Sequence, residues 1–287
     1  MSIFHSDDVM CVKCVELRVL SIERSLKFYV DILGLTIDEK RERRVLLKAN
    51  SGNVIIELHE DPHALPLGIT QGLYHYALLV EDRSALACMI KQCVRHRYPI
   101  TGASDHGVSE AIYLDDPDGH GVEIYRDKQV SEWPVENDHI TMYTKPLDLD
   151  AVMQTYIDKP YRVPNMILGH IHLHVPKLDD AKRFYSDVLG FNVVMYYMQS
   201  ALFISDANYH HHIGLNTWHN DAPLLDTRQI GLISYTLHVP KIRYHGFMKR
   251  LFDAHVSVLT DEKGSYIVDI LNQRIYLDVE KKDLGGL

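Results

Sequence analysis

Residues 28–35 read FYVDILGL and residues 184–191 read FYSDVLGF, so one pattern occurs twice in the chain. A second block behaves in the same way, because Gly72-Leu73-x-x-Tyr76 returns as Gly231-Leu232-x-x-Tyr235. The first block begins at residue 28 and again at residue 184, which is 156 positions later. The second block begins at residue 72 and again at residue 231, which is 159 positions later. Two blocks at nearly one separation are not expected by chance. The 287 residues therefore form two homologous halves in tandem.

Each half contains two similar groups of strands around a helix. In the first, the pattern predicts a strand over residues 12–19, a helix opened by Ser21 and ending near Leu33-Gly34, and strands over 44–49 and 53–59. The order returns as a strand over 73–80, a helix over 82–96, and strands over 111–114 and 121–125. The predicted fold class is α+β, with four βαβββ units in two homologous tandem halves.

Polar, proline-containing sequence separates the two halves. Residues 131–165 predict a linker, with one helix expected after Leu147-Asp148-Leu149-Asp150. The expected domains are residues 1–130 and residues 166–287.

The overall composition bounds the function. With 46% hydrophobic and 24% charged residues, the chain is typical of a soluble globular protein. A net charge of −9 argues against a nucleic-acid partner, which needs a basic face, and no apolar run is long enough to span a membrane. The N-terminal MSIFHSDDVM lacks a basic segment followed by an apolar one, so we expect no secretory signal and a cytoplasmic location.

The four cysteines all lie in the first third of the chain, so a disulfide framework is not expected. Cys11 and Cys14 form a C-x-x-C, but no second pair completes a zinc site. Ordinary buried thiols are favoured over a redox or metal role.

Residues 104–125 predict a hairpin with unusual side chains. Two strands flank the turn Asp116-Pro117-Asp118-Gly119, and Glu123 stands at mid-strand between Val122 and Ile124. A carboxylate in an apolar run is either exposed on a surface turn or buried with a cationic partner.

Aligning the halves supplies candidate partners for Glu123. His75 faces Ser234, His170 faces Cys14, and the Glu123 hairpin faces residues 272–273, which carry no carboxylate. Two histidines and one carboxylate from separate strands form the facial triad that suits non-haem Fe(II), and Mn(II) shares this geometry. The pattern predicts one metal site and one inactive counterpart, and it requires the second unit to pair with the third.

Simpler interpretations exist for each histidine alone. His75 could be an ordinary core or surface residue. His170, His172 and His174 alternate along one face, as an edge facing water would also require. The complementary loss of ligands between the halves favours the metal site.

The chain resembles the vicinal oxygen chelate superfamily and, within it, the extradiol ring-cleavage dioxygenases of the catechol 2,3-dioxygenase type. The long motif of that class matches at His106, Ile112-Tyr113, Asp116-Pro117, Gly119 and Glu123, whereas Ser104 departs from it. The resemblance implies a small aromatic diol and O2 as substrates, and a 2-hydroxymuconate semialdehyde-type product.

The resemblance also implies roles around the metal. His211, in the run Tyr209-His210-His211-His212, would take a proton from the catechol and return it later, while Tyr113 and His106 would hydrogen-bond the substrate oxygens. Strand alternation would send His210 and His212 to the opposite face, so the choice within this run stays open.

Three other functions remain open, and a homo-oligomer is compatible with the sequence. The ring could be a hydroquinone. The protein could be a glyoxalase-like or thiol-transferase enzyme of the same superfamily, although Ile213, aligned with Glu57, offers no fourth ligand. It could also be a binding protein without a metal, against which the complete triad argues.

Overall fold

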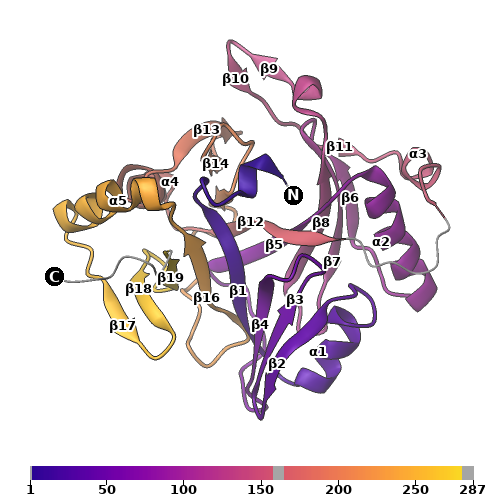
Figure 1. Ribbon diagram of the computed structural model, residues 1–287, viewed down its shortest axis with the longest axis horizontal. Helices are drawn as coiled ribbons and strands as arrows, with labels where there is room; N and C mark the ends of the chain where they lie inside the picture. The colour runs from indigo at the N-terminus through magenta and orange to yellow at the C-terminus, as the bar shows by residue number, and fades with distance from the viewer. Residues whose placement is uncertain (1, 158–164, 280–287) are drawn as a thin grey trace.

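The computed structural model describes residues 2–157 and 165–279, which form two large mixed sheets with helices at the periphery (Figure 1). The first half contains β1 (Cys11–Val19), α1 (Ile22–Tyr29), β2 (Thr36–Arg41), β3 (Arg44–Lys48), β4 (Val54–Glu60), then β5 (Gly72–Val80), α2 (Arg83–His96), β6 (Gly102–Asp105), β7 (Ser109–Asp115) and β8 (Gly121–Asp127). The second half contains β12 (Met166–His174), α4 (Leu178–Ala181) with a π-helical segment (Lys182–Val188), β13 (Asn192–Tyr197), β14 (Ala201–Ser205), β15 (Ile213–Asn216), then β16 (Gly231–His238), α5 (Lys241–Asp253), β17 (Leu259–Asp261), β18 (Gly264–Val268) and β19 (Arg274–Asp278). The α+β class and the four βαβββ units are confirmed.

Each sheet combines one unit from each half. The eight-stranded sheet has the order β17-β18-β19-β16-β1-β4-β3-β2, so the first unit joins the fourth through antiparallel β1 and β16. In the nine-stranded sheet, β11-β6-β7-β8-β5-β12-β15-β14-β13, the second unit joins the third through antiparallel β5 and β12. The pairing of units that the metal hypothesis required is therefore present.

The segment between the halves carries short elements of its own. These are a 3-10 turn (Val130–Glu132), β9 (Val135–Glu136), β10 (His139–Ile140), β11 (Lys145–Pro146) and α3 (Leu149–Met153). The helix expected after Leu147 is α3, and β11 extends the nine-stranded sheet by pairing with β6. Residues 158–164 of the predicted linker lie outside the described residues, and the division into domains 1–130 and 166–287 stays a prediction.

The repeated Phe-Tyr pattern has a structural role in each half. Tyr29 donates a hydrogen bond from its hydroxyl to Oδ2 of Asp116 at 2.8 Å, and Oδ1 of Asp116 accepts the backbone N–H of His120 at 2.9 Å. In the second half, Tyr185 donates to Asp269 at 2.6 Å in the same way. The tyrosine thus fixes the turn that precedes the last strand of the next unit, which in the first half is β8 with Glu123.

Alternation along β8 separates core from site. Val122 and Ile124 belong to the main hydrophobic core, whereas Glu123 and Tyr125 point to the opposite face of the sheet. Glu123 is only 3% exposed, so its interpretation as a solvent-facing residue on a surface turn is wrong.

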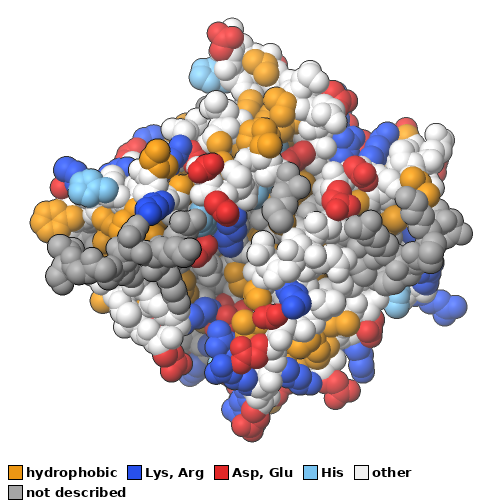
Figure 2. Space-filling model, viewed as in Figure 1, with side chains coloured by type: hydrophobic (Ala, Val, Ile, Leu, Met, Phe, Trp, Pro, Cys, Tyr) orange, Lys and Arg blue, Asp and Glu red, His pale blue; other side chains and the backbone are white. Residues whose placement is uncertain are grey.

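Acidic and basic side chains are interspersed over the face of the molecule drawn in Figure 2. Among the described residues, no helix has the length and apolar character needed to cross a membrane.

Candidate metal centre and active site

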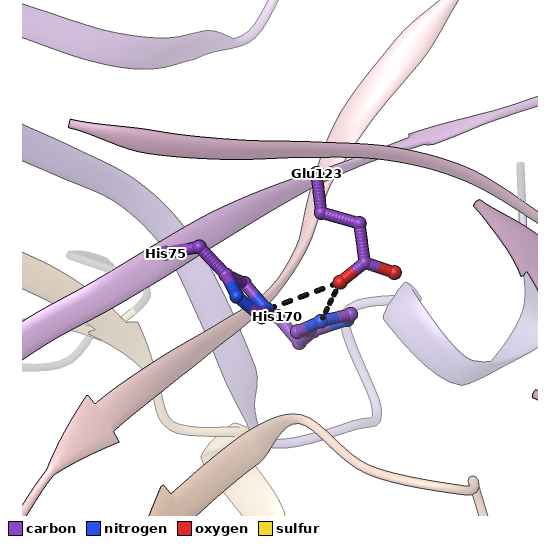
Figure 3. A group of neighbouring side chains, drawn as sticks. All are labelled: His75, Glu123 and His170. Atoms are coloured by element: carbon purple, nitrogen blue, oxygen red, sulfur yellow. Dashed lines mark ion pairs between the residues drawn. The ribbon is translucent and has the colours of Figure 1, made fainter. Parts of the chain in front are cut away.

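Three side chains from three neighbouring strands of the nine-stranded sheet converge. His75 comes from β5, Glu123 from β8 and His170 from β12, and one possible ligand atom of each lies within 4.8 Å of the others. Oε2 of Glu123 lies 3.0 Å from Nε2 of His75 and 3.4 Å from Nε2 of His170, as the dashed lines of Figure 3 mark. The sequence placed these residues about 50 positions apart along the chain, and pairing of the two halves brings them together.

The unsatisfied atoms of this group fit a metal ion. Nε2 of His75 and both ring nitrogens of His170 are buried and have no hydrogen-bond partner among the residues that the structure describes. An octahedral divalent ion with bonds of about 2.1 Å would place neighbouring ligand atoms about 3.0 Å apart. Two neutral imidazoles and one carboxylate on one side of an ion are the donor set of a non-haem Fe(II) site.

Two glycines let the strands approach closely enough to form this group. A Cβ on Gly169, the residue before His170, would lie 2.0 Å from the Tyr125 hydroxyl. A Cβ on Gly121 would lie 2.5 Å from the carbonyl oxygen of Tyr74. A side chain at either position would push β12 or β8 away from the site.

The charge states of the group suit metal binding. Burial would raise the pKa of the Glu123 carboxyl, but the adjacent His170 and His75 rings hold this pKa well below its usual range. Burial lowers the pKa of His170 to about 4, although Glu123 opposes this shift. At neutral pH the site therefore offers a carboxylate and a neutral imidazole, the forms that bind metal ions.

A cavity of about 260 Å³ opens above the three residues. Apart from them, its walls are aromatic, histidine and small polar side chains and one methionine, namely Tyr74, Ser104, His106, Ser109, Tyr113, Met142, Tyr143, Thr144, His172, Tyr197, Phe203, His211 and Trp218. The structure thus brings all six residues singled out from the sequence, His75, Glu123, His170, His106, Tyr113 and His211, to one cavity.

His106 and Tyr113 are bound to each other. Nε2 of His106 lies 2.7 Å from the Tyr113 hydroxyl, and Nδ1 lies 3.1 Å from the carbonyl oxygen of Tyr143. Because a carbonyl can only accept, we assign the ring proton to Nδ1, and Tyr113 then donates to Nε2. Burial and the nearby Glu123 raise the pKa of Tyr113 well above its usual range, so its neutral hydroxyl oxygen can accept a hydrogen bond from a ligand.

The histidine run 210–212 separates into three environments. His211 lines the cavity and packs on His170, with ring centroids 4.1 Å apart. His210 is fully buried and contacts Asp127, while His212 accepts the backbone N–H of Asp206 at 3.1 Å and donates to the carbonyl oxygen of Phe4 at 2.8 Å. Burial and the neighbouring His170 and His210 rings lower the pKa of His211 well below its usual value, so its ring is neutral at neutral pH.

Several residues of the cavity and of its surroundings were given no role from the sequence. His172 and His174 are 4% and 6% exposed, so the interpretation of this strand face as an edge in contact with water is wrong. Phe203 and Tyr197 gave no signal, since aromatic residues on strands are ordinary core residues, and Trp218 lies in the turn that follows β15. Asp127 could have been found, because it is two residues after Tyr125 and four after Glu123 and thus on the same face of β8.

Among the residues that the structure describes, the related position between the first and fourth units holds no comparable set. Cys14 and Ser234 replace the two histidines, and burial raises the pKa of the Cys14 thiol to about 12, so it is protonated at neutral pH. Strand register corrects one alignment: Val15 pairs with Ile56 as Ile171 pairs with Ile213, so Gly214, and not Ile213, corresponds to Glu57. Gly214 likewise offers no fourth ligand.

Comparisons with known proteins agree with this fold. The model of the Glyoxalase/Bleomycin resistance protein/Dioxygenase superfamily matches residues 12–124 and 167–264. The chain is 38% identical over 273 residues to the catechol-2,3-dioxygenase of Bacillus subtilis (strain 168), covering 89% of this chain and 95% of that protein. It is 26% identical over 194 residues to the metapyrocatechase of Pseudomonas sp. (strain CF600), covering 62% and 53%. A solved putative dioxygenase from Bacillus subtilis superposes with a TM-score of 0.68 at 13% identity, over 95% of this chain and 86% of that one, which shows the fold alone.

Proposed function

The chain belongs to the glyoxalase/bleomycin resistance protein/dioxygenase superfamily, also called the vicinal oxygen chelate superfamily, and from this premise we propose that it is an Fe(II)-dependent extradiol dioxygenase. In this proposal it uses O2 to cleave a catechol-type ring beside the diol and forms a 2-hydroxymuconate semialdehyde-type product. The likeness to a catechol-2,3-dioxygenase over most of the chain supports the reaction class. A cytoplasmic location stays a prediction.

One observation carries the proposal. Two histidines and a carboxylate converge in a buried group in which Nε2 of His75 and both ring nitrogens of His170 lack hydrogen-bond partners among the described residues. This group forms the floor of a cavity that three further polar candidates also line. His75, Glu123 and His170 would hold the ion, and Mn(II) would fit the same donors. When bound, Fe(II) would supply the electronic link between an electron-rich ring and O2.

The remaining residues have roles that follow from their positions. His211, neutral and at the cavity wall, would take a proton from a catechol hydroxyl as a general base. It would later return this proton to the reacting molecule as a general acid. Tyr113, whose own proton is donated to His106, would accept a hydrogen bond from the second hydroxyl. The aromatic walls would hold the ring in position and exclude water.

Two alternatives from the same superfamily make different demands on the site. A hydroquinone would also fit an aromatic-walled cavity, because the triad recognises the metal and not the ring. A glyoxalase-like or thiol-transferase enzyme usually has a fourth protein ligand or a basic anion pocket, and at the fourth position this chain has Gly214. The dioxygenase proposal is therefore the better supported.

The direct test adds catechol to Fe(II)-loaded protein with and without O2. We expect a yellow ring-opened product only when O2 is present, and the same experiment with hydroquinone separates the first alternative. Samples loaded with Mn(II) show which ion supports turnover. Failure of the Fe(II)-loaded and Mn(II)-loaded protein to consume catechol or hydroquinone with O2 would contradict the proposal.

A further inference from the structure

His210 is fully buried and both of its ring nitrogens are occupied. Its Nε2 lies 2.9 Å from Oδ1 of Asp127 at the end of β8, and its Nδ1 lies 2.8 Å from Nδ1 of His211. His211 lines the cavity above the candidate metal centre, whereas Asp127 lines a second cavity of about 320 Å³. The three side chains form one continuous chain of hydrogen bonds.

The positions of the protons follow from the chemistry of the three groups. A carboxylate only accepts, so Nε2 of His210 carries the proton that Asp127 receives. A His210 ring that carries this single proton has a lone pair on Nδ1, which accepts from Nδ1–H of His211. The second nitrogen of His211, Nε2, is consequently the unprotonated one, and it is the nitrogen left for the cavity.

The Asp127 end of the chain is itself held in place. Tyr209 donates from its hydroxyl to both carboxylate oxygens of Asp127, at 3.1 and 3.2 Å, and shares a 2.8 Å hydrogen bond with the Tyr125 hydroxyl. Trp133 packs on the ring of His210 with centroids 5.3 Å apart. These contacts restrict the rotation of both members of the Asp127–His210 pair.

We propose that Asp127 and His210 are positioning residues that fix the tautomer of His211, so that its Nε2 atom faces the substrate as a proton acceptor. The inference rests on the proposed function, because it assigns the acceptor role to His211. It also explains why the neighbouring His212 cannot replace it: both ring nitrogens of His212 are used by backbone groups of Asp206 and Phe4.

Asp127→Asn is the informative change, because Asn has the same shape and can donate where Asp accepts. If the Asn amide donates to Nε2 of His210, the tautomers of His210 and His211 both reverse, and Nε2 of His211 then carries a proton. We expect kcat to fall by about 10²-fold while KM for catechol changes less than about threefold. Asp221→Asn, at an exposed site, is the control for loss of one negative charge.

A double-mutant cycle distinguishes positioning from a general structural effect. If Asp127 acts through His211, Asp127→Asn should have almost no further effect on kcat in a His211→Asn background. Independent, multiplicative losses in the two variants would overturn the proposal.

Nuclear magnetic resonance provides a readout that needs no turnover. In Zn(II)-loaded protein with ¹⁵N-labelled histidine, the signals lost in His211→Asn identify His211. We expect the Nδ1–H form in the parent protein and the Nε2–H form in Asp127→Asn. An Nε2–H form of His211 in the parent protein would overturn the positioning role of Asp127 and His210, even if catechol is cleaved. If the tautomers are as expected but catechol is not cleaved, the proposed function is rejected instead.

Discussion

Tyr276 occupies the position in the eight-stranded sheet that Glu123 occupies in the nine-stranded sheet. Glu123 pairs with Ala77 of β5, and Tyr276 pairs with Thr236, the residue that corresponds to Ala77 in β16. Beside Tyr276, the ammonium of Lys263 lies 2.9 Å from Glu16 and 2.7 Å from Glu57. The eight-stranded sheet thus has an ion-pair cluster of one lysine and two glutamates in this region. The nine-stranded sheet has the two histidines and Glu123 of the candidate metal centre instead.

The first prediction compares the two related positions. Glu123→Ala should abolish Fe(II) retention and turnover, because it removes the only anionic group of the candidate triad. Cys14→Ala, at the position related to His170, should leave both unchanged, since the Cys14 thiol is protonated at neutral pH. Iron content by elemental analysis and catechol consumption measure the outcome. An equal loss in Cys14→Ala would contradict a single metal site.

A second prediction concerns Lys263, whose side chain is 24% exposed between Glu16 and Glu57, which are 12% and 4% exposed. Lys263→Met leaves two mostly buried carboxylates without this cation, although Arg44 still contacts Glu57. We expect the free energy of unfolding to fall by about 1–3 kcal/mol, as for a partly buried ion pair. Urea unfolding measures this loss, and iron retention should not change. An unaltered free energy of unfolding would mean that Lys263, Glu16 and Glu57 behave as solvated surface charges.

The sequence allowed the fold and the triad to be predicted because both depend on repeats and on alternation. The repeated Phe-Tyr and Gly-Leu blocks fix the order of units. The carboxylate in the apolar strand left Glu123 either exposed or buried with a partner, and the structure shows that it is buried. Each half lacks a candidate ligand that the other half retains. This complementarity indicated that His75 of the first half and His170 of the second half meet at one site.

The sequence could not settle two finer points. Residues 209–212 lie outside any strand, after two residues with positive φ, Ala207 and Asn208, so alternation could not separate His211 from its neighbours. The register of β15 is also shifted by one residue relative to β4, and no sequence block near it reports the shift. Contacts far apart in sequence, such as Asp127 with His210, determine the rest.

The third prediction tests the acid–base residue. His211→Asn should retain iron, because His211 is not among the three candidate ligands, and lose turnover by about 10²- to 10⁴-fold. Steady-state kinetics of iron-loaded samples measure the loss. Retained turnover would show that His211 is not the acid–base residue.

The fourth prediction concerns acid stability through His5. This ring is 5% exposed and donates from Nε2 to the carbonyl oxygen of Gly169 at 2.8 Å, while burial, followed by the neighbouring His212, lowers its pKa to about 3. The unfolded chain binds this proton below about pH 6.5 and the folded chain does not, so stability is full above pH 6.5 and falls as pH drops towards 3. The loss from this residue is up to about 1.4 kcal/mol per pH unit. We expect the free energy of unfolding of His5→Gln, measured in urea between pH 7.5 and 5.5, to decline less steeply than that of the parent protein. His96→Gln, at an exposed site, is the control. Equal slopes in His5→Gln and the parent protein would contradict this role of His5.

The last prediction concerns which catechols are accepted. Among the described residues that line the cavity, none is Lys or Arg, and the only acidic one is the candidate ligand Glu123. A carboxylate on the ring would have to leave water without meeting a cation, whereas a methyl group would contact aromatic walls such as Phe203 and Trp218. We therefore expect kcat/KM for 4-methylcatechol to exceed that for 3,4-dihydroxybenzoate by at least about 10²-fold, which corresponds to a polar group left unpaired in the site. Tyr197→Arg, which brings a guanidinium to the cavity wall, should narrow this ratio, because it supplies the missing cation. Comparable kcat/KM values for the two substrates in the parent protein would show that the carboxylate is directed to solvent. The aromatic walls would then not determine which substituted catechols are accepted.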